Sequence, residues 1–134
     1  MDQYAGCGSG VVVRVLVVDD DADIAAMLAL MVTKLGHHGE ACSEPTEAIE
    51  HHALGLLSGR YDLIICDYMM SPNGVAVLEE FIASGAYRVL LTGSYMSAEL
   101  QRALVLGVAH EVIQKPLSLV ELSRVLDRAS VMAR

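Results

Sequence analysis

The segment 61–70 has the sequence YDLIICDYMM, in which a run of apolar residues stops at Asp67. A short apolar run that is rich in Ile and Leu and bounded by polar residues is typical of a strand buried on both faces, as in a parallel sheet. The carboxyl ends of parallel strands border the ligand crevice of an open sheet, so Asp67 is expected to face a site. The simpler alternative is a surface acid that ends a strand, although a carboxylate beside a core is costly unless something pairs with it.

Four other segments are predicted to be strands, and helical segments separate them. The strand segments are Val11–Val18, His37–Ser43, Arg88–Thr92 and Val112–Gln114, of which the polar segment His37–Ser43 suits the edge of a sheet. Apolar residues spaced three and four apart predict the helices. They include Ile24, Ile49, Leu78, Leu100 and Leu122, and the first four helices end at Gly36, Gly59, Gly85 and Gly107.

The alternation of five strands with five helices predicts a doubly wound α/β sheet with right-handed crossovers. Residues 11–134 are expected to form one domain, and the Gly-rich residues 1–10 a flexible leader. Ser43 is expected to open the second helix, and Ile82 to lie in the buried stripe of the third. One of Asp19, Asp20 and Asp21 is explained as the cap of the first helix, but three acids are more than a cap needs.

Composition excludes several classes of partner. The formal charge is -8, the pI is about 4.9, and the nine Lys and Arg residues are scattered, which disfavours nucleic acid and anionic membranes. No basic and apolar leader and no long apolar run are present, so neither a signal peptide nor a membrane span is expected. Protein partners and a cytoplasmic location are the remaining expectation.

Cysteines and histidines do not form a recognisable metal-binding pattern. Cys7, Cys42 and Cys66 are odd in number and lack the CxxC spacing, which disfavours a disulfide framework or a zinc site and suits a reducing compartment. The adjacent pairs 37–38 and 51–52 are histidines, but neighbouring side chains diverge and no third ligand recurs at a matching spacing.

Polar residues with complementary chemistry follow four of the predicted strands. Asp19 and Asp20 follow the first, Asp67 ends the third, Thr92 ends the fourth and Lys115 follows the fifth. Parallel strands bring these residues to one edge of the sheet. Carboxylates about 4 to 6 Å apart repel one another and need a cation, and hard oxygen ligands suit Mg²⁺ together with a phosphoryl group. Asp67 is the candidate nucleophile, Lys115 the fixed cation and Thr92 the hydroxyl donor.

The motifs VLVVDDD, LIICDYMM, LLTG and VIQKP occur in this order, and together they resemble the CheY-like receiver domain of two-component response regulators. The resemblance covers residues 12 to about 131. It implies the flavodoxin-like strand order 2-1-3-4-5, which is known from members of this family and is taken here from the resemblance alone. It also implies a signalling phosphoacceptor that is not an enzyme in the usual sense, since it catalyses only its own phosphorylation and slow autodephosphorylation.

The resemblance implies a role for each acid. Asp67 would become an aspartyl phosphate by accepting the phosphoryl group of a phosphohistidine on a sensor kinase or phosphotransfer protein. Asp19, Asp20 and Asp67, with the backbone carbonyl of Met69, would hold Mg²⁺, for which Mn²⁺ is a substitute. Phosphorylation would then alter affinity for a downstream protein at the face formed by the fourth helix, the fifth strand and the fifth helix.

The same resemblance implies a switch, from which this sequence departs. Thr92 and Lys115 would bond the phosphoryl oxygens, and Pro116 would follow a cis peptide bond. The family has an aromatic residue three positions before the lysine, where this chain has Val112, so the usual coupling of threonine to an aromatic side chain is missing or replaced. Tyr95 is a candidate replacement.

The loop after Asp67 also departs from the family. Proline four residues and glycine eight residues after the acceptor are usual, whereas this chain has Ser71 and Val75 there, with Pro72 and Gly74 nearby. The loop is therefore predicted to be one residue shorter than usual, with the carbonyl of Met69 still in place.

Three other functions remain to be weighed. A receiver domain that binds partners without phosphorylation usually loses a site residue, and none is lost here. A haloacid-dehalogenase-type phosphatase would use Asp19, Thr92 and Lys115, but Asp23 stands where Thr or Val belongs, and Asp67 would have no role. Flavin binding is disfavoured because the acidic loop after the first strand would repel a phosphate.

Overall fold

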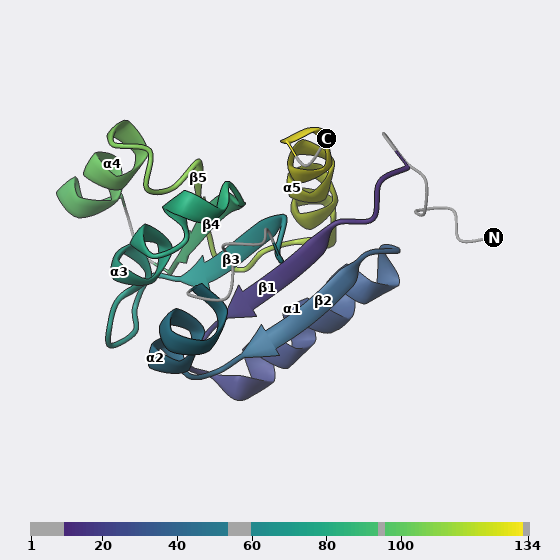
Figure 1. The fold of residues 1–134 in the computed structure, drawn as a ribbon, viewed down its shortest axis with the longest axis horizontal. Helices are drawn as coiled ribbons and strands as arrows, with labels where there is room; N and C mark the ends of the chain where they lie inside the picture. Colours follow the sequence, from purple (N-terminus) through teal and green to yellow (C-terminus); the bar gives the residue numbers. More distant parts are fainter. Residues whose placement is uncertain (1–9, 54–59, 94–95, 133–134) are drawn as a thin grey trace.

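The sheet has five parallel strands in the order β2-β1-β3-β4-β5 in a computed structural model, which describes residues 10–53, 60–93 and 96–132 (Figure 1). This is the predicted order, and the predicted fold class is confirmed. The strands are β1 (Arg14–Val18), β2 (His38–Cys42), β3 (Leu63–Asp67), β4 (Tyr87–Thr92) and β5 (Glu111–Gln114). The polar strand β2 lies at an edge of the sheet, as its sequence indicates.

Helical segments connect the strands on both faces of the sheet. They are α1 (Ala22–Lys34), α2 (Pro45–Glu47) with the π-helical η1 (Ala48–Ala53), α3 (Gly74–Glu79) with the 3₁₀-helical η3 (Ile82–Ser84), α4 (Ala98–Val105) and α5 (Leu119–Met132). Among the described residues, none of these helices combines the length and the apolar character that crossing a bilayer requires.

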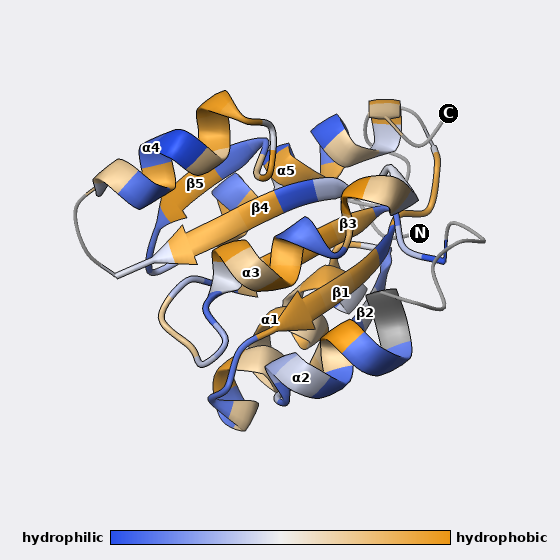
Figure 2. Ribbon diagram, turned by 60° about the vertical axis from the view of Figure 1, so that its left-hand side comes forward, coloured by the Kyte–Doolittle hydropathy of each residue, from blue (hydrophilic) through white to orange (hydrophobic). Residues whose placement is uncertain are grey.

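Two apolar layers cover the sheet, because successive residues of a strand point to opposite faces. Val15 and Val17 of β1 belong to the layer that α1 and α5 cover. Leu16 and Val18 belong to the layer that the second, third and fourth helical segments cover. Figure 2 shows β1 and the later part of β4 in orange, which agrees with their burial between these layers.

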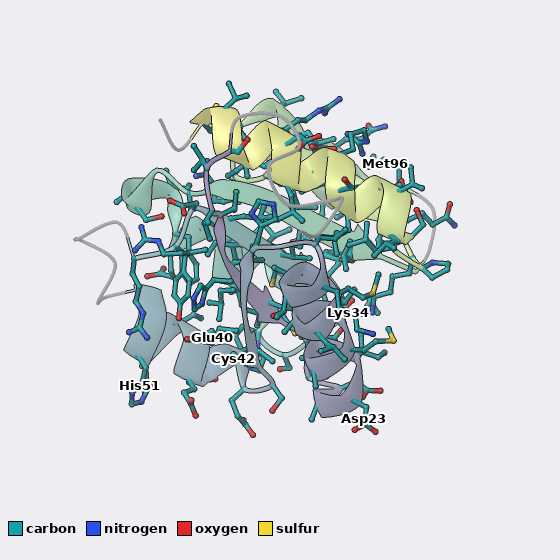
Figure 3. The ribbon with its side chains drawn as sticks, turned by 90° about the vertical axis from the view of Figure 1, so that its right-hand side faces the viewer. Asp23, Lys34, Glu40, Cys42, His51 and Met96 are labelled. Atoms are coloured by element: carbon teal, nitrogen blue, oxygen red, sulfur yellow. The ribbon has the colours of Figure 1, made fainter. Side chains whose placement is uncertain are left out.

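The caps and charges of α1 follow from its sequence. The side chain of Asp21 accepts hydrogen bonds from the backbone amides of Asp23 and Ile24, so Asp21 is the one of the three acids that caps the helix. Asp23 lies in the first turn and Lys34 in the last, at opposite ends of the helix (Figure 3), where each charge complements the helix dipole. Asp19 and Asp20 are therefore left for another role.

Several predicted boundaries differ from those of the structure. The first strand begins at Arg14, not Val11, because its pairing with β2 begins at His38. The second helix is capped at Glu44, not Ser43, and the expected end at Gly59 lies outside the described residues. The third helix stops at Glu79, and a separate 3₁₀ turn follows the buried Phe81. Ile82 lies in this turn and is 45% exposed, and Gly85 ends the turn with a φ of 76°.

Arg88 is a buried charged residue that attaches α4 to the sheet. It is 6% exposed, and its guanidinium donates hydrogen bonds to the carbonyl oxygens of Ala86, Gly107 and Val108 at 2.7 to 2.8 Å. Gly107 and Val108 follow the C-terminus of α4, where a cation is favourable. Burial lowers the pKa of the guanidinium from its ordinary value. The C-terminal end of α4 is therefore fixed to the start of β4.

Candidate functional site

The predicted site residues lie at the carboxyl edge of the sheet. Asp67 is the last residue of β3 and pairs in register with Leu91, the neighbour of Thr92. Thr92 pairs with Gln114, which Lys115 follows directly. The backbone amide of Lys115 donates to the carbonyl of Thr92 at 2.7 Å, so these two residues are held side by side.

Three carboxylates converge at this edge. Asp19, Asp20 and Asp67 each place one oxygen so that the three atoms lie within 4.8 Å of one another. Asp19 and Asp67 are buried, with 2% and 7% of their surfaces exposed, whereas Asp20 is exposed. The cluster is therefore buried on one side and open to solvent at Asp20.

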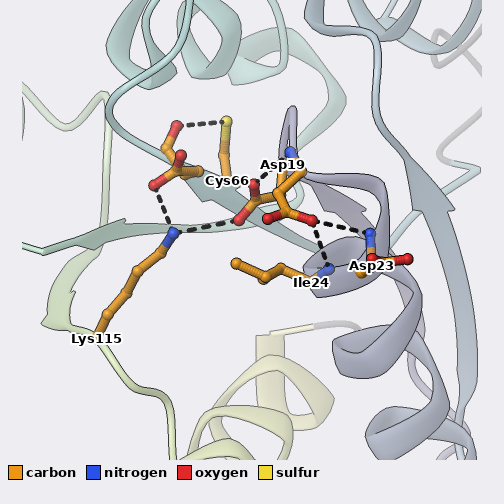
Figure 4. Close-up of polar contacts among 7 residues, drawn as sticks. Asp19, Asp23, Ile24, Cys66 and Lys115 are labelled. Carbon is orange, nitrogen blue, oxygen red and sulfur yellow. Dashed lines mark hydrogen bonds and ion pairs between the residues drawn. The ribbon is translucent and has the colours of Figure 1, made fainter.

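Lys115 supplies the positive charge that this cluster needs. Its Nζ lies 3.0 Å from Oδ1 of Asp67 and 3.2 Å from Oδ2 of Asp19. Figure 4 shows the lysine reaching from the loop after β5 toward Asp19. The backbone amide of Asp21 donates to Oδ1 of Asp19 at 2.9 Å, so both oxygens of Asp19 have partners.

The surroundings of Asp67 oppose its negative charge. Burial raises its pKa from the ordinary value, and the negative charges of Asp19 and Asp20 act in the same direction, while the hydrogen bond from Lys115 acts against them. Burial lowers the pKa of Lys115, but its bonds and charge interactions with Asp67 and Asp19 outweigh burial and raise it. A further cation near the acids would therefore stabilise the ionised site.

Thr92 is placed at this edge, but the residue expected to complete the switch is small. Thr92 is 3% exposed, at the end of β4. Val112 is half-buried on β5 and packs against the apolar layer beneath α3 and α4. Tyr95 lies outside the described residues. The peptide bond between Lys115 and Pro116 is cis.

The loop of residues 68–73, here the 68–73 loop, joins β3 to α3 beside the acids. Met69 and Asp20 line the same open hollow of 480 Å³. The peptide bond between Ser71 and Pro72 is cis, which the sequence did not indicate. A Cβ at Gly74 would lie 2.3 Å from the carbonyl oxygen of Asp67, so this position requires glycine. The requirement at Gly74 agrees with a loop shortened by one residue.

Glu99 is a residue near this loop that sequence reasoning missed. Its carboxylate accepts a hydrogen bond from the hydroxyl of Tyr68, and Nδ2 of Asn73 lies 3.4 and 3.5 Å from its two oxygens. Glu99 lies in the first turn of α4, 31 residues from Tyr68. No local pattern marks such a contact, because it depends on how α4 packs beside the loop.

The donor set fits a hard divalent cation. The three acids offer carboxylate oxygens within 4.8 Å, and the exposed Asp20 leaves that side accessible to solvent. Mg²⁺ binds one or two carboxylates and keeps several water ligands, which a half-open cluster permits. Burial, together with the charges of Asp19 and Asp20, raises the pKa of Asp67 in spite of the hydrogen bond from Lys115, so a second cation at the cluster would stabilise the ionised form of this acid.

Comparison with known proteins gives a family. Residues 15–127 match the family described as response regulator receiver domain. A receiver domain protein of Clostridium thermocellum has a solved structure that is similar, with a TM-score of 0.76 and 23% identity over 91% of this chain and 97% of that one. A CheY-like receiver domain protein of Methanospirillum hungatei has a TM-score of 0.75 and 21% identity over 92% and 98%. At these identities the structures support the fold alone.

Curated proteins also match part of the chain, among them a DNA mismatch repair protein. The DNA mismatch repair protein MutS of Rickettsia akari is 32% identical over 78 residues, which are 54% of this chain and 8% of that protein. The chain therefore spans a small fraction of this relative, and the match says nothing of what the chain itself does.

Proposed function

Because this chain belongs to the response regulator receiver domain family, we propose that it accepts a phosphoryl group on Asp67 from a phosphohistidine of a sensor kinase or phosphotransfer protein. The family is a signalling module and not a class of conventional enzymes. The observation that carries the proposal is the position of Asp67, a buried carboxylate within reach of two other acids and 3.0 Å from the ammonium of Lys115. Such donors work in the cytoplasm, which is the proposed location.

In the proposed transfer, an oxygen of Asp67 forms a bond to phosphorus as the bond between phosphorus and the donor nitrogen breaks. The imidazole of the donor keeps the electron pair, and the product is an aspartyl phosphate. The raised pKa of Asp67 makes its carboxylate more basic than a free one. Lys115 balances charge on the transferring oxygens, and Thr92 supplies a hydroxyl donor at the adjacent strand end.

The proposed metal ligands are Asp19, Asp20, Asp67 and the backbone carbonyl of Met69. Three of them form the carboxylate cluster, and Met69 lines a hollow together with Asp20. Mg²⁺, or Mn²⁺ in its place, would neutralise negative charge on the acids and on the phosphoryl group. The buried side of the cluster excludes water from Asp67, because Asp19 and Asp67 are almost fully covered.

The proposed output is a change in affinity for a protein partner at the face formed by α4, β5 and α5. A modification at Asp67 alters this face only if the face has two conformations that interact differently with the phosphoryl group. Thr92 and Lys115 adjoin β5, since Thr92 pairs with Gln114. Val112 replaces the usual aromatic residue on this strand, so another contact must supply part of the coupling.

The proposal is tested by mass spectrometry of the intact chain. Incubation with a small acyl phosphate and Mg²⁺ should add one phosphoryl mass to the wild type, and Asp67→Asn should abolish the addition. Glu80→Ala is the matched control, because Glu80 is an exposed acid at the C-terminal end of α3. This variant should gain the phosphoryl mass as the wild type does. An unmodified wild type at saturating donor would favour a binding module that acts without phosphorylation.

A further inference from the structure

Both ends of the 68–73 loop are held by one side chain from another element. Tyr68 begins the loop and Asn73 ends it, and both direct hydrogen-bonding groups to the carboxylate of Glu99 on α4. Asn73 also caps α3 by accepting from the amide of Ala76 at 3.0 Å. The contact, here the Glu99 bridge, therefore links the loop, the start of α3 and the first turn of α4.

The main chain of the loop closes on itself at the same place. The carbonyl of Tyr68 accepts from the amides of Met70 at 3.0 Å and Gly74 at 2.9 Å. The amide of Tyr68 donates to the carbonyl of Leu91 at 2.8 Å. Met69 lies within this closed turn, next to Tyr68. The orientation of the Met69 peptide thus depends on how Tyr68 is held.

We propose that Glu99 is a positioning residue for the metal site: it holds the 68–73 loop in the shape that presents the carbonyl of Met69 and couples that site to α4. This inference rests on the proposed function, because it assigns Glu99 to the metal site proposed there. Glu99 acts through Tyr68 and Asn73, and it is neither a metal ligand nor a group that touches the phosphoryl donor.

The bridge gives this chain a route from the acids to α4 that does not use β5. Tyr68 directly follows Asp67, and Glu99 lies in the first turn of α4. The route contains polar groups that form hydrogen bonds, whereas Val112 on β5 has an aliphatic side chain that cannot form one. Binding at the acids that orders the loop therefore orders the first turn of α4 as well, and by linkage the converse holds.

The first measurement is the affinity of the full chain for Mg²⁺ alone, by titration calorimetry without a phosphodonor. Glu99→Ala removes both acceptors and should weaken binding about tenfold, the effect typical of losing a group that orients a metal ligand. Tyr68→Phe removes one hydroxyl and should weaken binding in the same direction. The double variant should lose less affinity than the sum of the two single losses, because both changes break the contact between Tyr68 and Glu99, although the Tyr68 hydroxyl also has a hydrogen bond with Ser97.

Two controls separate positioning from charge and from folding. Glu99→Gln removes the charge but keeps an oxygen that accepts hydrogen bonds from Tyr68 and Asn73, so it should retain most of the affinity. Glu80→Ala removes an equal charge from an exposed site on the neighbouring segment and should bind as the wild type does. Unfolding midpoints without metal identify any variant that has lost its fold.

The second measurement is amide hydrogen exchange of the first turn of α4. Mg²⁺ should slow this exchange in the wild type and in Glu99→Gln, and should leave it unchanged in Glu99→Ala. Equal Mg²⁺ affinity in wild type and Glu99→Ala would overturn the inference, as would Glu99→Gln binding as weakly as Glu99→Ala. Failure of the proposed function is a different result, in which the wild type gains no phosphoryl mass.

Discussion

At the scale of single residues, Asp67 is held in a position that disfavours its ionised form. Burial is the main cause of its raised pKa, and Asp19 and Asp20 add to it, while Lys115 offsets part of the cost. When an acid has a higher pKa in the folded chain than in the unfolded chain, the folded state loses stability as the pH rises from the unfolded pKa to the folded pKa. The folded chain therefore holds this carboxylate, the proposed phosphoacceptor, at the expense of stability.

Asp67→Asn is expected to raise the unfolding midpoint by a few degrees at neutral pH without Mg²⁺. The amide carries no charge to bury, and Lys115 keeps its ion pair with Asp19 at 3.2 Å. The difference from wild type should be constant above the raised pKa of Asp67 and should shrink as the pH falls toward about 3.9, the ordinary value for aspartate. Thermal melts from acid to neutral pH measure it. A wild type that is the more stable at neutral pH would contradict this.

Lys115→Met is expected to lower the free energy of unfolding by about 3 kcal/mol, because it leaves two buried carboxylates without their counter-charge. The loss should be smaller in an Asp67→Asn background, where one of those charges is gone. Urea titrations of the four proteins give the coupling energy directly. Additive effects of the two substitutions would show that the ion pair between Lys115 and Asp67 contributes nothing to the free energy of unfolding.

The residues of the carboxylate cluster were predictable because each follows the end of an apolar run. Asp19, Asp67 and Lys115 needed only the rule that parallel strands share a carboxyl edge. Glu99 and Arg88 were not predictable in the same way. Glu99 meets Tyr68 across 31 positions, and Arg88 satisfies carbonyls 19 and 20 positions away, so both contacts depend on packing between elements.

At the scale of elements, the packing of α1 against β2 depends on one glycine. A Cβ at Gly39 would lie 2.3 Å from the carbonyl oxygen of Ala29, a backbone atom that cannot turn aside. The helix and the edge strand therefore approach one another more closely than a side chain at position 39 would permit. The edge strand is polar and, within the described sheet, pairs with a strand on one side, so it gains contact area from this approach.

Gly39→Ala is expected to cost about 2 kcal/mol of stability, because the helix or the strand must shift to admit a methyl group. Gly93→Ala is the matched control, since nothing lies within 4 Å of a Cβ at that position. Denaturant titrations of both variants make the comparison. Similar midpoints for the two would mean that α1 moves away from β2 without cost.

Most elements were predictable from the period of their apolar residues, but their internal irregularities were not. Val77 and Leu78 are fully buried, as predicted, whereas Ile82 is exposed because the helix breaks after Glu79. The second helix changes to a π-helix at Ala48, although its apolar pattern is continuous. Such breaks depend on how each helix meets the sheet, and a periodic pattern does not encode them.

At the scale of the whole molecule, the strand order came from family resemblance and not from the pattern of elements. Alternating strands and helices indicate a doubly wound sheet, but several orders satisfy that pattern. The position of the polar strand β2 at an edge was predictable from its composition. The sequence therefore predicts the site residues better than it predicts the order of the strands in the sheet.

Mg²⁺ is expected to stabilise the whole chain, because ligand that binds only the folded state shifts the unfolding equilibrium. At a concentration 100 times its dissociation constant the gain is about 2.7 kcal/mol. Asp20→Asn should lose most of this gain while changing metal-free stability little, since Asp20 is exposed. Thermal melts with Mg²⁺ and with a chelator measure both. An equal gain in Asp20→Asn would place the ion elsewhere.

The attachment of Arg88 determines how α4 is able to move. The guanidinium fixes the chain just beyond the C-terminal end of the helix, while the N-terminal end is held through Glu99. If the contact through Glu99 is released, the expected displacement of α4 is a rotation about the end that Arg88 fixes, with an amplitude that increases along the axis. Eight residues span about 12 Å, so a tilt of about 10° moves Ala98 by about 2 Å and the opposite end hardly at all. A partner that contacts the first turn of α4 therefore experiences a much larger change than one that contacts Leu106.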